Sequence, residues 1–242
     1  IYLYLVEADT VVRYFIEKGK FRLDSTWKPG IIILPGQTTG TSFVVMDDWI
    51  VGQVNALPSA TPLSVIAIHQ SDALRQYSIQ PFYGDPISSS VASAFSKAAY
   101  GGENAISWAP ASVSVDPGSH LIYATDSIVG YLAAVRMTTT GLITLWKVDQ
   151  ATTELTTLIG SEKARILVGT DIPRKEIPGK NLNDYVVWRN GSTGEELARS
   201  PLLPSITPGT MIQPYYLGAM FYESQLGKLI KLEPVAKKGR IK

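Results

Sequence analysis

One arrangement of four short segments recurs along this 242-residue chain, and it constrains the fold more than any other feature. An apolar segment ends near a small or acidic residue, and an alternating segment follows it. A third segment follows a turn that carries Gly or Asp. Alternation at period two, rich in β-branched and aromatic residues, is typical of strands. The first segment occurs as LYLVEAD, DWIVGQV, LIYATDS, RILVGTD and AMFYES.

The other segments of the repeat place the turns. The second segment occurs as GYLAAVRM and DYVVWRN, and the third as TGLITLWKV and TGEELARS. Thr-Gly, Lys-Gly and Ser-Asp pairs stand between them, and Gly adopts positive φ there without steric cost, which keeps the neighbouring strands antiparallel. A fourth segment, often marked by Pro, precedes the first and occurs as KPGIIIL, WAPASVSV, ELTTLIG and GTMIQP.

A four-stranded antiparallel unit of this kind cannot bury both of its faces alone. Radial stacking of such units buries the faces and leaves only short edges, which is the β-propeller solution. A sandwich of two sheets also uses alternating strands, but it does not require the same four-part order to recur. We therefore predict an all-β chain in which residues 1–235 form a β-propeller of four-stranded antiparallel blades.

The number of strands bears on the completeness of the ring. The first unit lacks its innermost strand and the last unit lacks its outermost one, so about five blades are present. Because closed rings of such blades usually hold more units, we predict the C-terminal part of a larger ring. A tight five-bladed ring is the alternative. Since Ile1 already lies in an apparent strand, we expect that an upstream segment was removed or lies outside this sequence.

The stretch IYATDSIVGYLAAVRMTTTGLITLWKV resembles the PQQ-like, or quinoprotein-type, β-propeller repeat. The residues that carry this resemblance are Gly130, Tyr131, Leu132, Ala133, Thr140, Gly141, Trp146, Thr193, Gly194, Gly227, Lys228 and Leu229. Ala198 and Arg199 depart from it, because the family usually has a docking tryptophan there. The resemblance covers nearly the whole chain outside 83–106. It implies a blade and gives little support for a bound quinone, since many proteins with such blades bind none.

The same resemblance implies a structural role for the tryptophans, because the family packs a Trp at the end of the outer strand between adjacent blades. Trp27 and Trp146 fall at that position. Trp188 lies on the preceding strand, and Trp49 opens an inner one. We expect all four to pack between blades rather than to stack on a ligand.

Residues 83–106 depart from the repeat and read as a long interblade insertion, in which SSSVASAFSKAAY suits a short helix. Long loops on a rigid scaffold are common places for function. Calcium prefers oxygen ligands, so Asp85, Glu103 and Asn104 are candidate metal ligands. Trp108 is a candidate partner contact beside them. A solvated loop with capping polar residues is the plainer interpretation.

Two further segments are candidate contacts. The connection TDIPRKEIPGKNLNDY has mixed charge and two prolines, so we predict an exposed loop that meets a partner or decorates the surface. Its candidate contact residues are Asp171, Arg174, Lys175 and Glu176. The tail 236–242 carries Lys237, Lys238, Arg240 and Lys242. We expect a disordered basic end there, with contact to an anionic membrane surface or partner as the alternative.

Composition excludes several function classes. The net charge of +1 gives no broad field for nucleic acid. The absence of cysteine excludes disulfides and thiolate chemistry. No apolar run approaches the roughly 18 residues that span a bilayer. His69 and His120 fit no metal spacing, and no P-loop or G-x-S-x-G motif occurs.

These features favour an exported protein, periplasmic, cell-surface or extracellular, that acts as a scaffold. Its partner would be another protein or the remaining propeller segment. Two enzymatic alternatives stay open at this point. One is a quinoprotein dehydrogenase with PQQ and calcium, and the other is a tetrathionate-hydrolase-like enzyme with its site at the propeller channel. No catalytic or cofactor-binding residue of either singles itself out in the sequence.

Overall fold

The computed structural model describes residues 1–7, 9–33, 37–38, 43–56, 63–82, 113–126, 130–152, 156–173, 183–207 and 210–233. Within these ranges the chain consists of β-strands joined by turns and three short 3-10 helices. The predicted insertion 83–106 and the basic tail 236–242 lie outside the described residues. Among the residues that are described, no helix is long and apolar enough to cross a membrane.

The first sheet has the strand order β1-β2-β3. Its strands are β1 (Tyr2–Glu7), β2 (Thr10–Glu17) and β3 (Lys20–Leu23). The loop Lys18-Gly19 joins β2 to β3, and its two residues have positive φ angles of 49° and 73°. A two-residue loop of this kind matches the twist of the strands that it connects, so the Lys-Gly pair forms a hairpin as predicted.

The second sheet has the order β4-β6-β7-β8, with β5 also paired to β6. Its strands are β4 (Gln37–Thr38), β5 (Val44–Met46), β6 (Trp49–Ala56), β7 (Ser64–His69) and β8 (Gln76–Ile79). The prediction of a strand at KPGIIIL is wrong, because residues 28–33 form none. Gly30 has a φ of 78°, and the N–H groups of Ile32 and Ile33 both donate to the Asp9 carbonyl. Those amides are therefore not available to a strand ladder.

The third and fourth sheets show the predicted four-strand order in full. The third contains β9 (Ser114–Asp116), η1 (Pro117–Ser119), β10 (Leu121–Asp126), β11 (Tyr131–Thr138) and β12 (Gly141–Asp149). The fourth contains β13 (Thr157–Ile159), η2 (Glu162–Ala164), β14 (Ile166–Asp171), β15 (Asn183–Asn190), β16 (Glu196–Arg199) and β17 (Leu203–Pro204). In both sheets the outer pairing, β11 with β12 and β15 with β16, contains a bulge.

The fifth sheet has the order β18-β19-β20. It contains β18 (Gln213–Pro214), η3 (Tyr216–Gly218), β19 (Met220–Glu223) and β20 (Leu229–Leu232). Among the described residues, no strand pairs with the inner edge of β1 and none with the outer edge of β20. The two end sheets are therefore three-stranded, as the sequence predicts.

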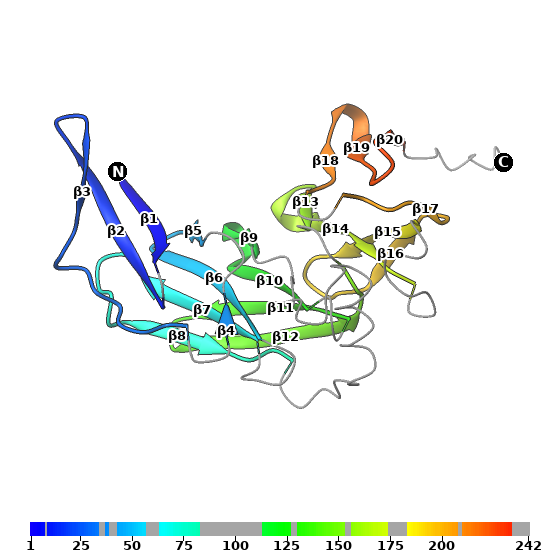
Figure 1. Cartoon of the computed structure of the whole chain (residues 1–242). Helices are drawn as coiled ribbons and strands as arrows, with labels where there is room; N and C mark the ends of the chain where they lie inside the picture. The colour runs from blue at the N-terminus through cyan, green and yellow to red at the C-terminus, as the bar shows by residue number, and fades with distance from the viewer. Residues whose placement is uncertain are drawn as a thin grey trace.

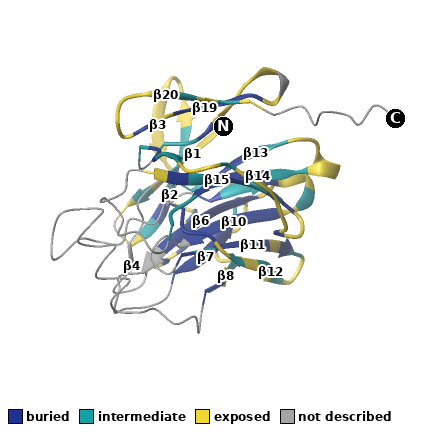
Figure 2. Cartoon of the chain, turned by 90° about the vertical axis from the view of Figure 1, so that its right-hand side faces the viewer, coloured by how far each residue is buried: buried dark blue, intermediate teal, exposed yellow. Residues whose placement is uncertain are grey.

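Successive sheets pack face to face, and a core cluster fills each of the four junctions between them. Figure 1 shows the sheets along an open arc, with β1–β3 and β18–β20 at its opposite ends. Figure 2 shows the buried residues concentrated in the middle of the stack, in β6, β7, β10 and β11. This succession of antiparallel sheets confirms the predicted all-β propeller class with five blades. Representative core pairs are Val11–Ile50, Val51–Ile122, Tyr123–Leu167 and Val168–Met220.

Candidate functional site

Most of the predicted site residues lie outside the described part of the chain. These are Asp85, Glu103, Asn104, Trp108, Arg174, Lys175 and Glu176. Within the described ranges, no three His, Asp or Glu side chains gather as metal ligands. The calcium site therefore stays a prediction from the sequence, and Asp171 is the candidate contact whose surroundings the structure shows.

Asp171, at the end of β14, joins the third and fourth sheets. Its Oδ2 accepts a hydrogen bond from Arg199 Nη1 at 2.7 Å, and its Oδ1 accepts the N–H of Ala151 at 3.0 Å. Arg199 also donates to Glu196 at 2.8 Å and lies over the ring of Tyr185 at 5.0 Å. The charges of this network are thus matched within the protein, which is typical of a structural contact.

A buried arginine extends this network towards the third sheet. Arg189 Nε donates to Gln150 Oε1 at 2.6 Å, and Nη1 donates to the Gly194 carbonyl at 3.0 Å. Burial lowers the pKa of Arg189. The hydrogen bond from Arg199 lowers the pKa of Glu196, and the same bond raises the pKa of Arg199. Glu196 and Arg199 therefore both stay charged at neutral pH. Arg199 pairs with Asp171 of β14 and Glu196 pairs with Arg189 of β15 at 3.4 Å, and these ion pairs fix β16 on the neighbouring strands.

The two histidines lie in separate structural contacts. His69 ends β7, its Nδ1 lies 3.0 Å from Ser71 Oγ, and its ring packs edge-on against Trp49. His120 follows η1 with a φ of 53°, and its Nδ1 lies 3.2 Å from Asp47 Oδ2. Each histidine meets one neighbour on an exposed turn, which suits a polar residue at a strand end.

At three of the four junctions, an aromatic side chain of the earlier sheet donates a hydrogen bond to a main-chain carbonyl of the next sheet. The donor comes from the outer strand of its sheet or from the loop after it. The acceptor lies in or beside the β7–β8, β11–β12 or β15–β16 turn. These aromatic latches are Trp27 Nε1 to the His69 carbonyl at 3.3 Å, Tyr77 OH to Thr139 at 3.0 Å and Trp146 Nε1 to Gly191 at 3.0 Å. At the fourth junction the donor belongs to the later sheet, because Tyr222 OH of β19 donates to the Pro204 carbonyl of β17 at 2.8 Å.

The predicted tryptophans all lie at sheet junctions. Trp27 is part of the core between the first and second sheets, and Trp146 packs in the core between the third and fourth. Trp188 packs at the last junction, and Trp49 stacks on Tyr77 with ring centroids 4.9 Å apart. Sequence reasoning missed the Tyr77 latch because the family pattern has Trp there. The sequence did contain one signal for this latch, because Tyr77 lies in the third segment of the second unit.

A hollow of about 360 Å³ lies beside the first latch. Its lining residues are Arg13, Thr26, Trp27, Lys28, Ser71, Asp72, Ala73 and Leu74. The buried guanidinium of Arg13 is already occupied, because it donates to Asp24 Oδ2 and to the Gln70 carbonyl. Because these two groups already bind the Arg13 guanidinium, it is not available to bind a ligand in the hollow.

The face of β1–β3 that points away from the second sheet is apolar, and none of the described strands packs on it. Tyr4, Val6 and Val11 pack against the second sheet, so the alternate positions point the other way. An antiparallel sheet that faces water usually carries polar residues on that side. We call this surface the outer apolar face. It consists of Leu3, Leu5, Val12, Tyr14, Ile16, Phe21 and Leu23.

The outer apolar face matches, pair by pair, a face that is buried in the third sheet. A two-residue loop joins β2 to β3 in the first sheet and β11 to β12 in the third, which fixes the equivalence. The equivalent residues of the third sheet pack against the second sheet. In the first sheet, by contrast, Leu5 is 42% exposed and Phe21 is 60% exposed. The equivalent pairs are Leu3–Tyr14 with Ile122–Val135, Leu5–Val12 with Ala124–Ala133, and Ile16–Phe21 with Met137–Leu142.

The face of β18–β20 that points away from the fourth sheet is also uncovered, but its side chains are mixed. We call it the far face. Leu229 is 73% exposed and Tyr215 is 59% exposed, and Tyr215 packs edge-on against Phe221. Lys231 extends over the Phe221 ring, 5.9 Å from its centroid. Lys231 also forms an ion pair with Glu233, so apolar rings and a paired cation share this surface.

Comparison with known proteins gives likenesses among solved structures. No protein-family model and no curated protein matches the chain. BamB from Moraxella catarrhalis is 16% identical over 96% of this chain and 63% of its own, with a TM-score of 0.45. The computationally designed Ika4 protein is 12% identical over 82% of this chain and 94% of its own, with a TM-score of 0.44. A chain of the nidogen/laminin complex is 12% identical over 96% and 78%, with a TM-score of 0.41.

Proposed function

We propose that this chain is an exported, PQQ-like propeller that serves as a protein-binding scaffold, with the outer apolar face as its docking surface. The observation that carries the proposal is the contrast in burial between equivalent positions. Leu3, Leu5 and Phe21 are exposed, whereas their equivalents in the third sheet lie in a sheet–sheet core. A contiguous exposed apolar surface of this kind marks an interaction site, and removing it from water favours a complex.

The junctions support the scaffold interpretation. Trp27 and Trp146 lie between sheets at the positions where PQQ-like blades carry their docking tryptophan. The charged groups near Asp171 bind one another rather than pointing at an open site. The candidate calcium ligands Asp85, Glu103 and Asn104 lie outside the described residues.

Site-specific photo-crosslinking in cells of the source organism tests this proposal. A benzophenone amino acid replaces Phe21 in one variant and Leu74 in a control, since Leu74 is 81% exposed on the β7–β8 turn. We expect a discrete protein adduct from position 21 and none from position 74. Adding Leu5→Lys, which places a charge on the same face, should abolish the adduct. Equal crosslinking at both positions, or none at either, would contradict the proposal, and fractionation of the same cells tests export.

A further inference from the structure

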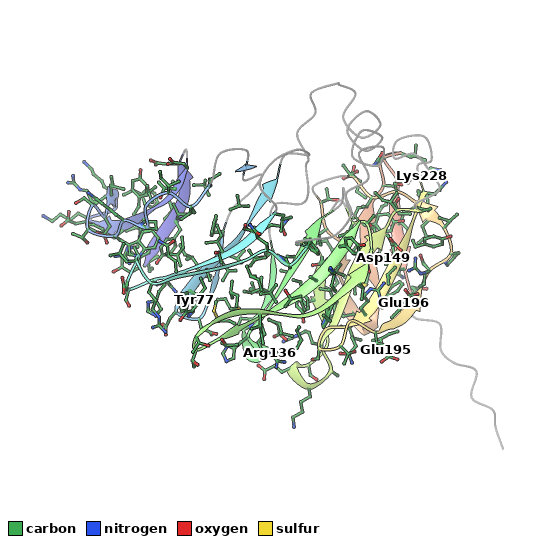
Figure 3. The ribbon with its side chains drawn as sticks, turned by 90° about the horizontal axis from the view of Figure 1, so that it is seen from below. Tyr77, Arg136, Asp149, Glu195, Glu196 and Lys228 are labelled. Atoms are coloured by element: carbon green, nitrogen blue, oxygen red, sulfur yellow. The ribbon has the colours of Figure 1, made fainter. Side chains whose placement is uncertain are left out.

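The turn between β15 and β16 contains the one Asn-Gly pair of the sequence, Asn190-Gly191. In such a pair the side-chain carboxamide reacts readily with the next main-chain nitrogen, because glycine has no side chain to hinder the approach. Asn190 has a structural reason to be there. Its Oδ1 accepts the N–H groups of Ser192 and Thr193, at 2.9 and 3.2 Å, which stabilises the turn. Glu195 follows the turn and marks its place in Figure 3.

Glycine at position 191 is required by the junction between the third and fourth sheets. The Gly191 carbonyl accepts hydrogen bonds from Trp146 Nε1 at 3.0 Å and from Tyr123 OH at 3.2 Å. A Cβ atom on this residue would lie 2.6 Å from Tyr123 OH and 3.3 Å from the Arg165 carbonyl oxygen. A side chain there would therefore displace the buried Tyr123 ring. The aromatic latch of this junction thus depends on a glycine that completes a reactive pair.

In the closed junction, the nitrogen that attacks in this reaction is held. The Gly191 N–H donates to the Arg165 carbonyl at 2.8 Å, and Gly191 is buried. Such main-chain hydrogen bonds become accessible to water only when the surrounding structure opens. Ring closure draws the Gly191 nitrogen towards Asn190 Cγ, so it has to break the bond to Arg165. It also pulls the Gly191 carbonyl away from its two donors.

We propose that Asn190-Gly191 is a deamidation site, which the closed junction protects and an open junction exposes. In the open state the deprotonated Gly191 nitrogen forms a bond to Asn190 Cγ, and Nδ2 leaves as ammonia after it takes up a proton. The product is a succinimide ring. Water then breaks the bond from the ring nitrogen to one of the two carbonyl carbons, with its hydroxyl going to the carbon and its proton to the nitrogen. Breakage at Cγ gives aspartate, and breakage at the main-chain carbonyl gives isoaspartate.

Isoaspartate makes an opening of the junction permanent. The main chain then runs through Cβ and Cγ of residue 190, so it contains an extra carbon atom before Gly191. With this longer path, the Gly191 N–H cannot reach Arg165 while its carbonyl reaches Trp146 and Tyr123. The inference is independent of the proposed docking surface, because it uses residues of the third and fourth sheets alone.

Ageing of the purified chain in mildly alkaline buffer, followed by peptide mass spectrometry, tests the inference. Trypsin cleaves after Arg189 and Arg199, so one peptide carries the site. Digestion at mildly acidic pH keeps the reaction slow during the measurement. We expect isoaspartate at position 190 to form at least about tenfold more slowly in the folded chain than in the same chain unfolded in urea.

A pair of matched variants tests the role of the junction. Trp146→Phe removes one donor to Gly191 but keeps a ring, and it should raise the rate of modification in the folded chain by about five- to tenfold. Trp27→Phe makes the same change in the latch of the first junction, and it should leave the rate at position 190 unchanged. Circular dichroism checks that both variants fold. Tyr123→Phe, which removes the other donor, replaces Trp146→Phe if the latter does not fold.

Each other outcome overturns the inference. Equal rates in the folded and unfolded chain would show that the closed junction gives no protection, and an unfolded chain that stays unmodified would exclude the site. A rate in Trp146→Phe equal to that of wild type would show that the latch does not control the reaction. An equal rise in Trp27→Phe would show that the exposure of the site does not depend on this junction in particular.

Discussion

The junction between the third and fourth sheets and the junction between the fourth and fifth have similar apolar cores but are closed by different contacts. At the earlier junction, Trp146 Nε1 and Tyr123 OH both donate to the Gly191 carbonyl, at 3.0 and 3.2 Å. At the later one, the Gln225 N–H donates to the Ser205 carbonyl at 2.9 Å. The later junction also has a ring contact, from Tyr222 OH of the fifth sheet to the Pro204 carbonyl at 2.8 Å, but no ring from the outer strand of the fourth sheet closes it.

The difference follows from a substitution in the repeat. Where the blade pattern has a docking tryptophan, the fourth unit has Ala198 and Arg199. Arg199 binds Asp171 within the fourth sheet, so this position contributes no ring to the last junction. An aromatic ring buries about 150–250 Å², so we expect the latched junction to be the more stable one.

The largest expected effect comes from removing a latch. Trp146→Ala deletes the indole from the core around Tyr123 and Leu167, and we expect a loss of about 3–5 kcal/mol in the free energy of unfolding. Trp146→Phe keeps an aromatic ring but loses the hydrogen bond, so about 1–2 kcal/mol is expected. Urea unfolding followed by circular dichroism measures both. A loss below about 1 kcal/mol for Trp146→Ala would show that the ring does not hold the junction.

An intermediate effect is expected at the first latch, and it depends on pH. Asp24 precedes Trp27, and hydrogen bonds from Thr26 and then from Arg13 lower its pKa to about 2. Because the folded pKa lies below the unfolded value of about 3.9, this stabilisation is present above about pH 4 and is lost as the pH falls towards 2. It amounts to at most about 2–3 kcal/mol.

The variant Asp24→Asn isolates that contribution. The difference in unfolding free energy between wild type and Asp24→Asn should be largest near neutral pH and should shrink between about pH 4 and pH 2. Urea titrations at a series of pH values measure it. A difference that stays constant over this range would show that the carboxylate charge does not secure the loop that carries Trp27.

The smallest effect is expected at the last junction. Gln225→Ala removes the bond from Gln225 Nε2 to the Ile206 carbonyl, 3.2 Å long, but keeps the main-chain bond to Ser205. Since the side chain lies at an exposed turn, we expect a loss of about 0.5–1 kcal/mol. The same urea titration measures it. A loss as large as that of Trp146→Ala would reverse our ranking of the two junctions.

Local patterns predicted the blades well, and they failed where a distant contact intervenes. The third and fourth sheets reproduce the predicted strand order, because alternation and Thr-Gly turns act over a few residues. KPGIIIL has strand-like composition, yet its Ile32 and Ile33 amides donate to Asp9, more than twenty positions away. The Tyr77 latch was also not predicted, because the acceptor of its hydrogen bond, the Thr139 carbonyl, lies in another sheet.

The order of strands within each blade and the turns between them were readable from the amino acids alone, because both depend on side-chain alternation and backbone preferences over short distances. Which carbonyl a ring reaches and which sheet face stays uncovered depend on how one sheet sits against the next. Those contacts join residues far apart in the chain, so the tertiary structure decided them. The exposed Phe21 and its half-buried equivalent Leu142 occupy the same place in the repeat, and Leu142 packs against a neighbouring sheet whereas Phe21 does not.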